Sequence, residues 1–493
     1  MKTYQMYIDG AWSDAAAGEV FESKNPYTGA PWAMIPRGRQ EDADRAVAAA
    51  KRAFRSDDWA RMTPSNRGHL LRKLGDLIAE NAEALARTEV QDNGKLFNEM
   101  FFQLKYVPEW FYYYAGLADK IEGSVIPIDK PDMLNFTRYE PLGVCVGITA
   151  WNSPLLLLAY KLAPALATGN TFIVKPSEFT SASTLELARL VDQVGLPKGV
   201  FNVVTGYGAE VGANLVEHED VAKVAFTGSE QTGRHIATVA AQTFKKVTLE
   251  LGGKSPNIVF ADAEIDNAVN GVISGIFAAS GQTCIAGSRL LVERRVHDEF
   301  LEKLLKLART ARIGNPMDTD TQVGPVTTEQ QLKKVLGYID VAKAEGAETL
   351  LGGVRPDNRP ELGEGWFVEP TIFGGVRNDM RIAREEVFGP VLSVIPFDSA
   401  EEALSIANDS RYGLAAGVWT QDIRKIKHFS ERLEAGTIWA NTYRVISYMA
   451  PLGGYKSSGL GRENGQNAIY QYLQTKSVMI STAGEVANPF IMR

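Results

Sequence analysis

The chain has 493 residues, of which 45% are hydrophobic and 23% are charged, and its formal net charge is −7. This length exceeds what one hydrophobic core usually organises, so two or three domains are expected in an ordinary globular protein. The acidic balance gives no electrostatic reason to bind nucleic acid or an anionic membrane, and the absence of an 18-residue apolar run argues against a membrane span.

Only two cysteines are present, Cys145 and Cys284, which is too few for a disulfide framework and typical of a reducing cytoplasm. No signal-type apolar run follows Met1, which favours the same cytoplasmic location. Cys145 lies in the apolar run GVCVGIT, where we expect a buried structural thiol.

The first hundred residues predict a short strand at 5–9, then helices at 41–54 and 65–89, where apolar residues recur at helical spacing. From Gly143 onward, short apolar runs alternate with helical patterns, which predicts right-handed βαβ units around a parallel sheet. The expected strands are 144–149, 171–174, 201–204, 223–226 and 257–260, and the expected helices are 155–167, 183–194, 209–217 and 230–241.

A second α/β pattern covers roughly 253–454, with strands expected at 288–292 and 391–396. Two other segments stand apart from these patterns. Residues 120–139 contain Pro127 and Pro131 and predict an extended excursion from the first domain. The tail 474–493 includes the strand-like run KSVMI.

Three polar side chains from separate segments have the chemistry needed for covalent catalysis. Cys284 in GQTCIAGSR is flanked by small residues, so a thiolate there can meet an electrophile without steric blockade. Glu250 in VTLELGGKSPN is suited to act as a base, and Asn152 in TAWNSP carries an amide that can stabilise an oxyanion. A lone cysteine is more often a small buried hydrophobe, but the three groups together favour a catalytic site.

A glycine-containing turn, Phe226-Thr227-Gly228-Ser229, leads from an expected strand into an expected helix, whose N-terminal amides favour an anion. Ligands of parallel sheets bind beyond the carboxyl ends of the strands. Gly228 and Gly233 do not match the G-x-G-x-x-G spacing, so the residues alone leave a dinucleotide site and ordinary turn glycines as equal alternatives.

Seven phrases in this order resemble the aldehyde dehydrogenase superfamily along essentially the whole chain: TAWNSP, KPSE, FTGSEQTG, LELGGKSPN, GQTCIAGSR, EEVFGP and PLGGYKSSGLGRE. The resemblance implies an α/β fold with a Rossmann-like parallel-sheet domain for the cofactor, a second α/β catalytic domain and a small β arm for oligomerisation. It puts the cofactor domain at 1–119 and 141–252, the catalytic domain at 253–461, and the arm at 120–140 and 462–493. An apolar edge strand needs a partner, so we expect a homodimer or homotetramer.

The implied reaction is the NAD⁺-dependent oxidation of a small-molecule aldehyde to a carboxylate, with no metal. Cys284 would attack the carbonyl, and Asn152 with the Cys284 backbone N–H would hold the negative oxygen. After hydride transfer, Glu250 would activate water to hydrolyse the thioester. Lys161 and Glu463 match positions near the proton path to this base, with an ordinary ion pair as the alternative.

The resemblance also implies a set of cofactor contacts. Lys175 and Glu178 match positions that hold the adenine ribose, and the Glu178 carboxylate would repel a 2′-phosphate, so we expect NAD⁺ to be preferred over NADP⁺. Glu386 and Phe388 match the residues at the nicotinamide ribose and ring, and Ser229 matches the pyrophosphate contact. The remaining implied positions are Trp151, Ser177, Gly208, Phe226, Thr227, Gly228, Leu251 and Gly252.

The sequence departs from the commonest family pattern at Ser153, where most relatives carry an aromatic residue that walls the substrate tunnel. Arg444 in TYRVISYMAP is expected near the tunnel mouth, with a solvated surface arginine as the alternative. Together these features favour a bulky, ring-derived or carboxylated (semialdehyde) substrate. The other implied tunnel positions are Tyr106, Trp110, Leu157, Ile285, Val445, Ile446 and Leu452.

Three alternatives remain. A CoA-acylating aldehyde dehydrogenase would pass the thioester to CoA, and it would not need Glu250 to activate water. A thiol hydrolase would need a histidine partner for Cys284, and none of the five histidines lies in a motif that suggests one. A non-catalytic binding protein is disfavoured because Cys284, Glu250 and Asn152 occur together.

Overall fold

A computed structural model of the chain describes residues 1–356, 359–485, 488 and 490–491. An eight-stranded sheet with the order β22-β12-β11-β8-β9-β10-β2-β3 forms the centre of the first domain. Its five central strands run parallel: β12 (Lys246–Glu250), β11 (Val221–Thr227), β8 (Val144–Ile148), β9 (Thr171–Lys175) and β10 (Phe201–Val203). Antiparallel strands lie at the edges, namely β22 (Gly459–Leu460), β2 (Met6–Ile8) and β3 (Ala11–Ser13).

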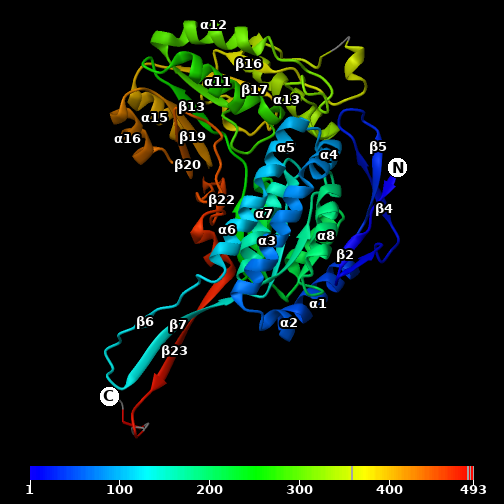
Figure 1. Ribbon diagram of the computed structural model, residues 1–493. Helices are drawn as coiled ribbons and strands as arrows, with labels where there is room; N and C mark the ends of the chain where they lie inside the picture. The colour runs from blue at the N-terminus through cyan, green and yellow to red at the C-terminus, as the bar shows by residue number, and fades with distance from the viewer. Residues whose placement is uncertain (357–358, 486–487, 489, 492–493) are drawn as a thin grey trace.

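Helices surround this sheet, and α3, α6, α7 and α8 lie close together in the middle of Figure 1. Because the central strands are almost wholly buried, both of their faces need such cover, as is usual for parallel sheets. The helices are α1 (Gln40–Arg55), α2 (Asp57–Ala60), α3 (Pro64–Glu80), α4 (Ala82–Asn93), α5 (Phe97–Tyr106), α6 (Pro108–Leu117), α7 (Pro154–Ala167), α8 (Ala182–Val194), α9 (Ala213–Glu217) and α10 (Glu230–Gln242).

Some expected elements of this domain differ in detail. The helix expected at 65–89 is two helices, because Asn81 leaves helical geometry and its side-chain amide bonds to the carbonyl of Leu77 at the end of α3. The helix expected at 209–217 begins as a π-helical turn, η1 (Gly208–Gly212). Strand β12, which ends at Glu250 just before the glycines of LELGGKSPN, is not among the expected strands. The strand expected at 257–260 belongs to the other sheet.

The second domain has a seven-stranded sheet with the order β15-β16-β17-β14-β13-β19-β20, in which only the edge strand β15 (Glu348–Leu351) is antiparallel among the described residues. The parallel strands are β16 (Thr371–Gly374), β17 (Val391–Phe397), β14 (Arg289–Glu293), β13 (Pro256–Val259), β19 (Ala415–Trp419) and β20 (Thr437–Ala440). The helices are α11 (Ile265–Phe277), α12 (His297–Ala308), α13 (Glu329–Ala344), α14 (Arg381–Arg384), α15 (Ala400–Asn408) and α16 (Ile423–Arg432).

A three-stranded arm projects from the body of the molecule (Figure 1). It consists of β6 (Val125–Ile126), β7 (Met133–Pro141) and β23 (Leu473–Ser481), and β7 pairs with β23 along its whole length. The expected excursion and strand-like tail therefore form one sheet, although residues 486–487, 489 and 492–493 of the expected arm lie outside the described residues. Shorter elements are β1 (Lys2–Thr3), β4 (Val20–Lys24), β5 (Pro31–Pro36), β18 (Tyr412–Gly413), β21 (Tyr455–Lys456), and the 3₁₀ turns η2 (Ala278–Gly281), η3 (Arg294–Val296), η4 (Pro360–Leu362) and η5 (Gln466–Tyr472).

The expected α/β class, with two parallel-sheet domains and a β arm, is confirmed. The exact domain boundaries stay a prediction, although β13 enters the second sheet at Pro256 and β22 returns to the first sheet at Gly459. None of the helices in the described part of the chain is long and apolar enough to cross a bilayer.

Candidate active site

The carboxyl ends of the five parallel strands in the first sheet bring most of the expected cofactor residues to one edge. Trp151 follows β8, Ser177 and Glu178 follow β9, and Gly208 follows β10. Ser229 follows β11, and Leu251 with Gly252 follows β12, while Phe226 and Thr227 are the last residues of β11. The strand order reverses between β8 and β11, which is the topological switch point where ligands of such sheets bind.

The loop that carries Cys284 is held in an unusual backbone conformation. Ala279, Ser280 and Gly281 have successive φ values of 54°, 52° and 70°, a left-handed stretch that costs conformational energy in the first two. A Cβ on Gly281 would lie 2.1 Å from the carbonyl oxygen of Gly389, so only glycine fits there. Such strain persists only where surrounding contacts fix it, and it is common at functional sites.

Both domains supply those contacts. From the first domain, Glu99 accepts from the backbone N–H of Ala279 at 2.9 Å. From the second domain, the Thr327 N–H donates to the Gln282 side chain at 2.9 Å, and the Tyr443 hydroxyl donates to the Ile285 carbonyl at 3.0 Å. The loop therefore lies at the junction of the two domains.

Asn152 meets this loop directly. It precedes α7, is 6% exposed, and its Nδ2 donates to the backbone carbonyl of Gln282 at 3.0 Å. The amide of Asn152 thus lies two residues from the nucleophile candidate along the loop. The structure brings Asn152 and Cys284 together from positions 132 residues apart in the sequence.

Cys284 is partly exposed and lies near two carboxylates. Burial, followed by the negative charges of Glu386 and Glu250, raises the pKa of its thiol to about 12. Glu250, at the end of β12, is 5% exposed, and its Oε1 has no hydrogen-bond partner among the described residues. Burial and the charge of Glu463 raise the pKa of Glu250 well above its usual value, which suits a base that acts near neutral or alkaline pH.

Lys161 and Glu463, expected near the proton path to this base, form the ion pair that was given as their alternative. Lys161 in α7 lies 2.5 Å from Glu463, and both side chains are almost completely buried. The Lys161 ammonium also donates to the hydroxyl of Thr227 at 2.7 Å. The charge of Glu463 raises the pKa of Glu250 and the charge of Lys161 lowers it, so the two residues act on the base in opposite directions.

Glu386 reaches from the second domain to the turn after β12. Its carboxylate accepts from the backbone N–H of Gly253 at 3.0 Å. A Cβ on Gly252 would lie 2.5 Å from this carboxylate, so a glycine is needed for the close approach. Two residues later, Phe388 has a φ of 59° and packs edge-on against Trp151, with 5.1 Å between ring centroids.

Polar side chains that could bind a ligand lie at the ends of β9 and β11. Lys175 is buried and forms an ion pair with the partly exposed Glu178 at 3.1 Å. The Ser229 hydroxyl caps the N-terminus of α10 by accepting from the Thr232 N–H at 3.2 Å. A Cβ on Gly208 would meet open space, so this turn leaves room beside η1.

The expected substrate positions come from α5, α6, α7 and the loops around Cys284 and Arg444. Leu157 and Ile285 are buried, whereas Tyr106 and Val445 are exposed. Trp110 is completely buried, and its Nε1 donates to the side chain of Asn464. Its ring makes an edge-to-face contact with the ring of Tyr106. The remaining three positions, Arg444, Ile446 and Leu452, are partly exposed.

Arg444 is neither free nor fully solvated. It has a φ of 66°, and its guanidinium donates to the carbonyl of Ser274 in α11 at 3.0 Å. This contact fixes the guanidinium against α11, while the place of Arg444 at the tunnel mouth stays a prediction, with a surface arginine as its alternative.

One functional candidate, Lys95, was not identified from the sequence. Its Nζ donates to the Ser153 hydroxyl at 2.8 Å, and that hydroxyl donates to the Gln103 side chain at 3.3 Å. From the sequence, Ser153 stands out only because it replaces the aromatic residue of most relatives. No local pattern links it to a lysine 58 residues away.

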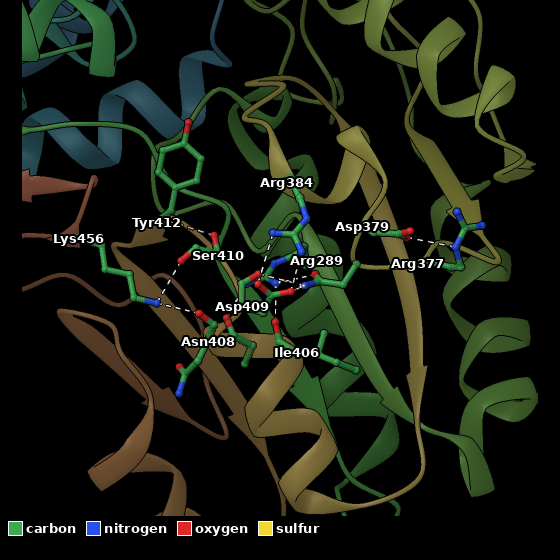
Figure 2. A network of polar contacts seen from close by, with 12 residues as sticks. Arg289, Arg377, Asp379, Arg384, Ile406, Asn408, Asp409, Ser410, Tyr412 and Lys456 are labelled. Carbon is green, nitrogen blue, oxygen red and sulfur yellow. Dashed lines mark hydrogen bonds and ion pairs between the residues drawn. The ribbon is translucent and has the colours of Figure 1, made fainter.

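The base of the Cys284 loop is anchored by the buried Arg289, the first residue of β14 (Figure 2). Its guanidinium donates to the carbonyls of Lys254, Ile406 and Ala407 at 2.8–2.9 Å and to Asn378 at 2.9 Å. A planar cation with five donors can satisfy several carbonyls at once, so Arg289 ties β14 to the segment after Gly253 and to the end of α15.

In the described part of the chain, no group of three or more His, Cys, Asp or Glu side chains could hold a metal ion. The histidines with polar side-chain contacts find them away from Cys284: His218 faces Asp44, His297 faces Asp298 and His428 faces Glu401. The arrangement thus offers Cys284 a carboxylate base rather than an imidazole.

Comparison with known proteins agrees with this geometry. The aldehyde dehydrogenase family model matches residues 12–478. The chain is 46% identical to (Z)-2-((N-methylformamido)methylene)-5-hydroxybutyrolactone dehydrogenase of Acinetobacter baylyi, over the full length of both, and 45% identical to human mitochondrial aldehyde dehydrogenase, over 97% of this chain and 92% of the relative.

Solved structures agree as well. A betaine aldehyde dehydrogenase mutant from Staphylococcus aureus, in complex with NAD⁺ and with a modified cysteine, aligns with a TM-score of 0.97 at 42% identity over 100% of both chains. An NAD⁺ complex of an aldehyde dehydrogenase from Bacillus cereus aligns with a TM-score of 0.95 at 45% identity, over 98% of this chain and 97% of the other. The chain belongs to the aldehyde dehydrogenase family of oxidoreductases.

Proposed function

We propose that the protein oxidises an aldehyde to a carboxylic acid with NAD⁺ and that Cys284 forms the covalent intermediates. One observation carries the proposal. The loop of Cys284, the amide of Asn152 and the unpartnered carboxylate of Glu250 converge at the carboxyl edge of a parallel sheet. Nucleophile, oxyanion donor and base are the three groups that acyl chemistry at a thiol requires.

The residues at the sheet edge fit NAD⁺. Glu178 offers a partly exposed carboxylate for ribose hydroxyls, and the capped N-terminus of α10 offers backbone amides for the pyrophosphate. Glu386 and the Trp151–Phe388 pair lie at the turn next to Cys284, where a nicotinamide ring and its ribose would be held. When bound, NAD⁺ supplies a hydride acceptor.

The chain's own residues account for the other steps. The thiolate of Cys284 adds to the aldehyde carbon, and the Asn152 amide with the Cys284 N–H stabilises the oxygen as it becomes negative. Loss of hydride leaves an acyl group on Cys284 as a thioester. Glu250 then removes a proton from water, the hydroxide attacks the thioester, and the carboxylic acid leaves as the thiol is restored. The Lys161–Glu463 pair influences how readily Glu250 holds that proton.

The substrate proposal is a ring-derived or carboxylated aldehyde. Ser153 is a small side chain where most relatives carry an aromatic ring, and the exposed ring of Tyr106 offers apolar surface. The Acinetobacter baylyi relative acts, by its name, on a 5-hydroxybutyrolactone. Such a hydroxylactone is the ring-closed form of a 4-oxo carboxylic acid, so a carboxylated aldehyde fits the relative and the cation Arg444 alike.

The experiment is an assay of NADH absorbance with the purified chain, using aliphatic, aromatic and carboxylated aldehydes with and without CoA. NADH formation without CoA is expected, and Cys284→Ser should abolish it because an alcohol is far less acidic than a thiol. Strict dependence on CoA would favour the acylating alternative, and ester hydrolysis without cofactor would favour a thiol hydrolase. No NADH from any aldehyde would contradict the proposal.

A further inference from the structure

A buried lysine, Lys95, lies in the wall beside Cys284 and is not part of the mechanism above. It follows α4, where Gly94 has a φ of 74° and turns the chain, and its side chain is only 4% exposed. Its Nζ donates to Ser153 at 2.8 Å, and among the residues that the structure describes it forms no ion pair. Burying a charge without a paired counter-ion is costly, so the protein keeps this ammonium for a reason beyond packing.

The groups around Lys95 leave hydrogen-bonding capacity unused. An ammonium has three donors, and Lys95 uses one of them on Ser153. Gln103 accepts from Ser153, but its own Nε2 is buried without a partner. Unsatisfied buried donors are rare in folded proteins, so two neighbouring residues with spare donors indicate that an acceptor from outside the chain completes them.

The charge of this place favours an anion. The groups that act on the Lys95 ammonium are Glu99 in α5, Arg444 in the loop after β20, Glu89 in α4 and Cys284. Burial raises the pKa of Glu89 to about 7, so near neutral pH it is not fully charged, and its carboxylate is already used by the Leu155 N–H at 2.9 Å. Glu99 is engaged with the Ala279 N–H. Two basic side chains, Lys95 and Arg444, thus lie near two carboxylates that are already engaged with backbone N–H groups.

We propose that Lys95, with Gln103, binds a carboxylate carried by the aldehyde substrate, and that Ser153 makes this possible by giving the ammonium a small polar neighbour instead of an aromatic wall. The inference rests on the proposed function and deepens it, because it assigns the substrate's second functional group to a residue next to the nucleophile. Arg444 then adds charge at the outer side, held by Ser274.

The test compares kcat/KM for an aldehyde acid with kcat/KM for its methyl ester, in the intact protein. The ester is the same size and lacks the charge, so the acid-to-ester ratio isolates recognition of the carboxylate from the chemistry at Cys284. In Lys95→Met the ratio should fall about tenfold or more, whereas Lys95→Arg should keep part of it. The matched control is Lys105→Met, which removes an exposed lysine from α5, the helix that follows Lys95 in the chain, and should leave the ratio unchanged.

A purely structural lysine would give a different result. Acid and ester would then lose activity by the same factor in Lys95→Met, and that outcome overturns the inference while leaving the proposed function intact. If no aldehyde, the aldehyde acid included, gives NADH with wild-type protein, the proposed function itself fails. The two failures are therefore distinguishable.

A wild-type pH profile provides a second test that does not depend on a variant folding. Burial is the main cause that lowers the pKa of Lys95, to about 8. The ammonium is charged below that pH, so the acid-to-ester ratio of kcat/KM should be highest near neutral pH and should fall as the pH rises through 8 to 9.5. Titration of Cys284 and Glu250 affects both substrates alike and cancels in the ratio. A ratio that stays flat over this range contradicts the inference.

Discussion

The thiol of Cys284 is acted on by burial and by the carboxylates of Glu386 and Glu250, and all three effects raise its pKa. In the free protein the thiol is therefore largely protonated at neutral pH, and the nucleophile needs a base or a shift in local charge before it can attack. Glu250 is a suitable acceptor, since its own pKa is raised by burial and by Glu463. Residues that change these charges should change the reactivity of the thiol.

Removing the charge of Glu386 should make Cys284 more reactive. In Glu386→Gln the thiol loses the carboxylate that contributes most to its raised pKa after burial. At pH 8 to 9 the rate of alkylation by iodoacetamide, followed by intact mass spectrometry without cofactor, should increase several-fold. Cys145 is completely buried and serves as the internal control, because it should stay unmodified. An unchanged alkylation rate would mean that Glu386 exerts no charge effect on the nucleophile.

Cofactor choice is a separate prediction at this scale and depends on Glu178. Its carboxylate is oriented by Lys175 and should repel a 2′-phosphate, so NAD⁺ should give the higher kcat/KM. In Glu178→Ser the preference for NAD⁺ over NADP⁺ should narrow by about tenfold, which corresponds to roughly 1.4 kcal/mol. Steady-state kinetics with both cofactors measures this. A wild-type preference for NADP⁺ would contradict the assignment of Glu178 to the ribose.

At the scale of elements, the geometry of the site depends on the loops that connect the strands and helices of the two domains. The Cys284 loop follows α11 and η2, and it is fixed by Glu99 of α5, Thr327 and Tyr443. Arg289 at the start of β14 secures its far end (Figure 2). The left-handed backbone of η2 is thus held by contacts from several elements, and a change that disturbs it should affect catalysis before it affects the fold.

Gly281→Ala should inactivate the protein. The φ of 70° disfavours any side chain, and the new Cβ would clash with the Gly389 carbonyl at 2.1 Å, so the loop must move. We expect a loss of at least about a hundredfold in kcat/KM for the aldehyde. Gly195→Ala is the matched control, because Gly195 also has a positive φ, of 84°, but its Cβ meets open space. Equal activity losses in the two variants would show that strain alone, not the loop's position, decides the outcome.

Local sequence patterns predicted the parallel strands β8, β9, β10 and β11 of the first sheet and β13, β14 and β17 of the second, because buried strands are short apolar runs between turn residues. The strands β15, β16, β19 and β20 of the second sheet were not predicted. The patterns failed at 65–89, where the apolar period continues across Asn81 and only its side-chain bond to Leu77 reveals the break. They also missed β12, because the two glycines that follow it, Gly252 and Gly253, drew attention to the turn and not to the strand. For the site, residue chemistry and the phrases shared with the family made Cys284, Asn152 and Glu250 the candidates, and their catalytic roles stay a prediction. The contact of Lys95 with Ser153 depends on tertiary packing that no local pattern contains.

At the scale of the whole molecule, the arm of β6, β7 and β23 leaves apolar side chains exposed. Val125, Leu134, Met479 and Ile480 are 73%, 44%, 61% and 46% exposed in the single chain. Exposed apolar strands far from the body invite pairing with another copy. A homodimer or homotetramer formed through the arm stays our prediction.

Ile480→Lys should weaken that assembly, because a charge would have to be buried where an apolar side chain was. Light scattering with size-exclusion chromatography at micromolar concentration should show a shift towards smaller species. Asp129→Lys, at an exposed site in the β6–β7 connection, is the control, since it adds positive charge to the same arm without removing apolar surface. A wild-type protein that is monomeric in this experiment would contradict the role of the arm.

The central claim is that Cys284 carries the acyl group and Glu250 releases it, and the variant Glu250→Gln tests both parts most directly. Rapid mixing of this variant with NAD⁺ and an aldehyde that the wild-type protein oxidises should give a burst of about one NADH per active site. Little turnover should follow, because water is no longer activated. Peptide mass spectrometry of the quenched protein should then find the acyl group on Cys284. Steady turnover at the wild-type rate, or an acyl group on any other residue, would contradict the account.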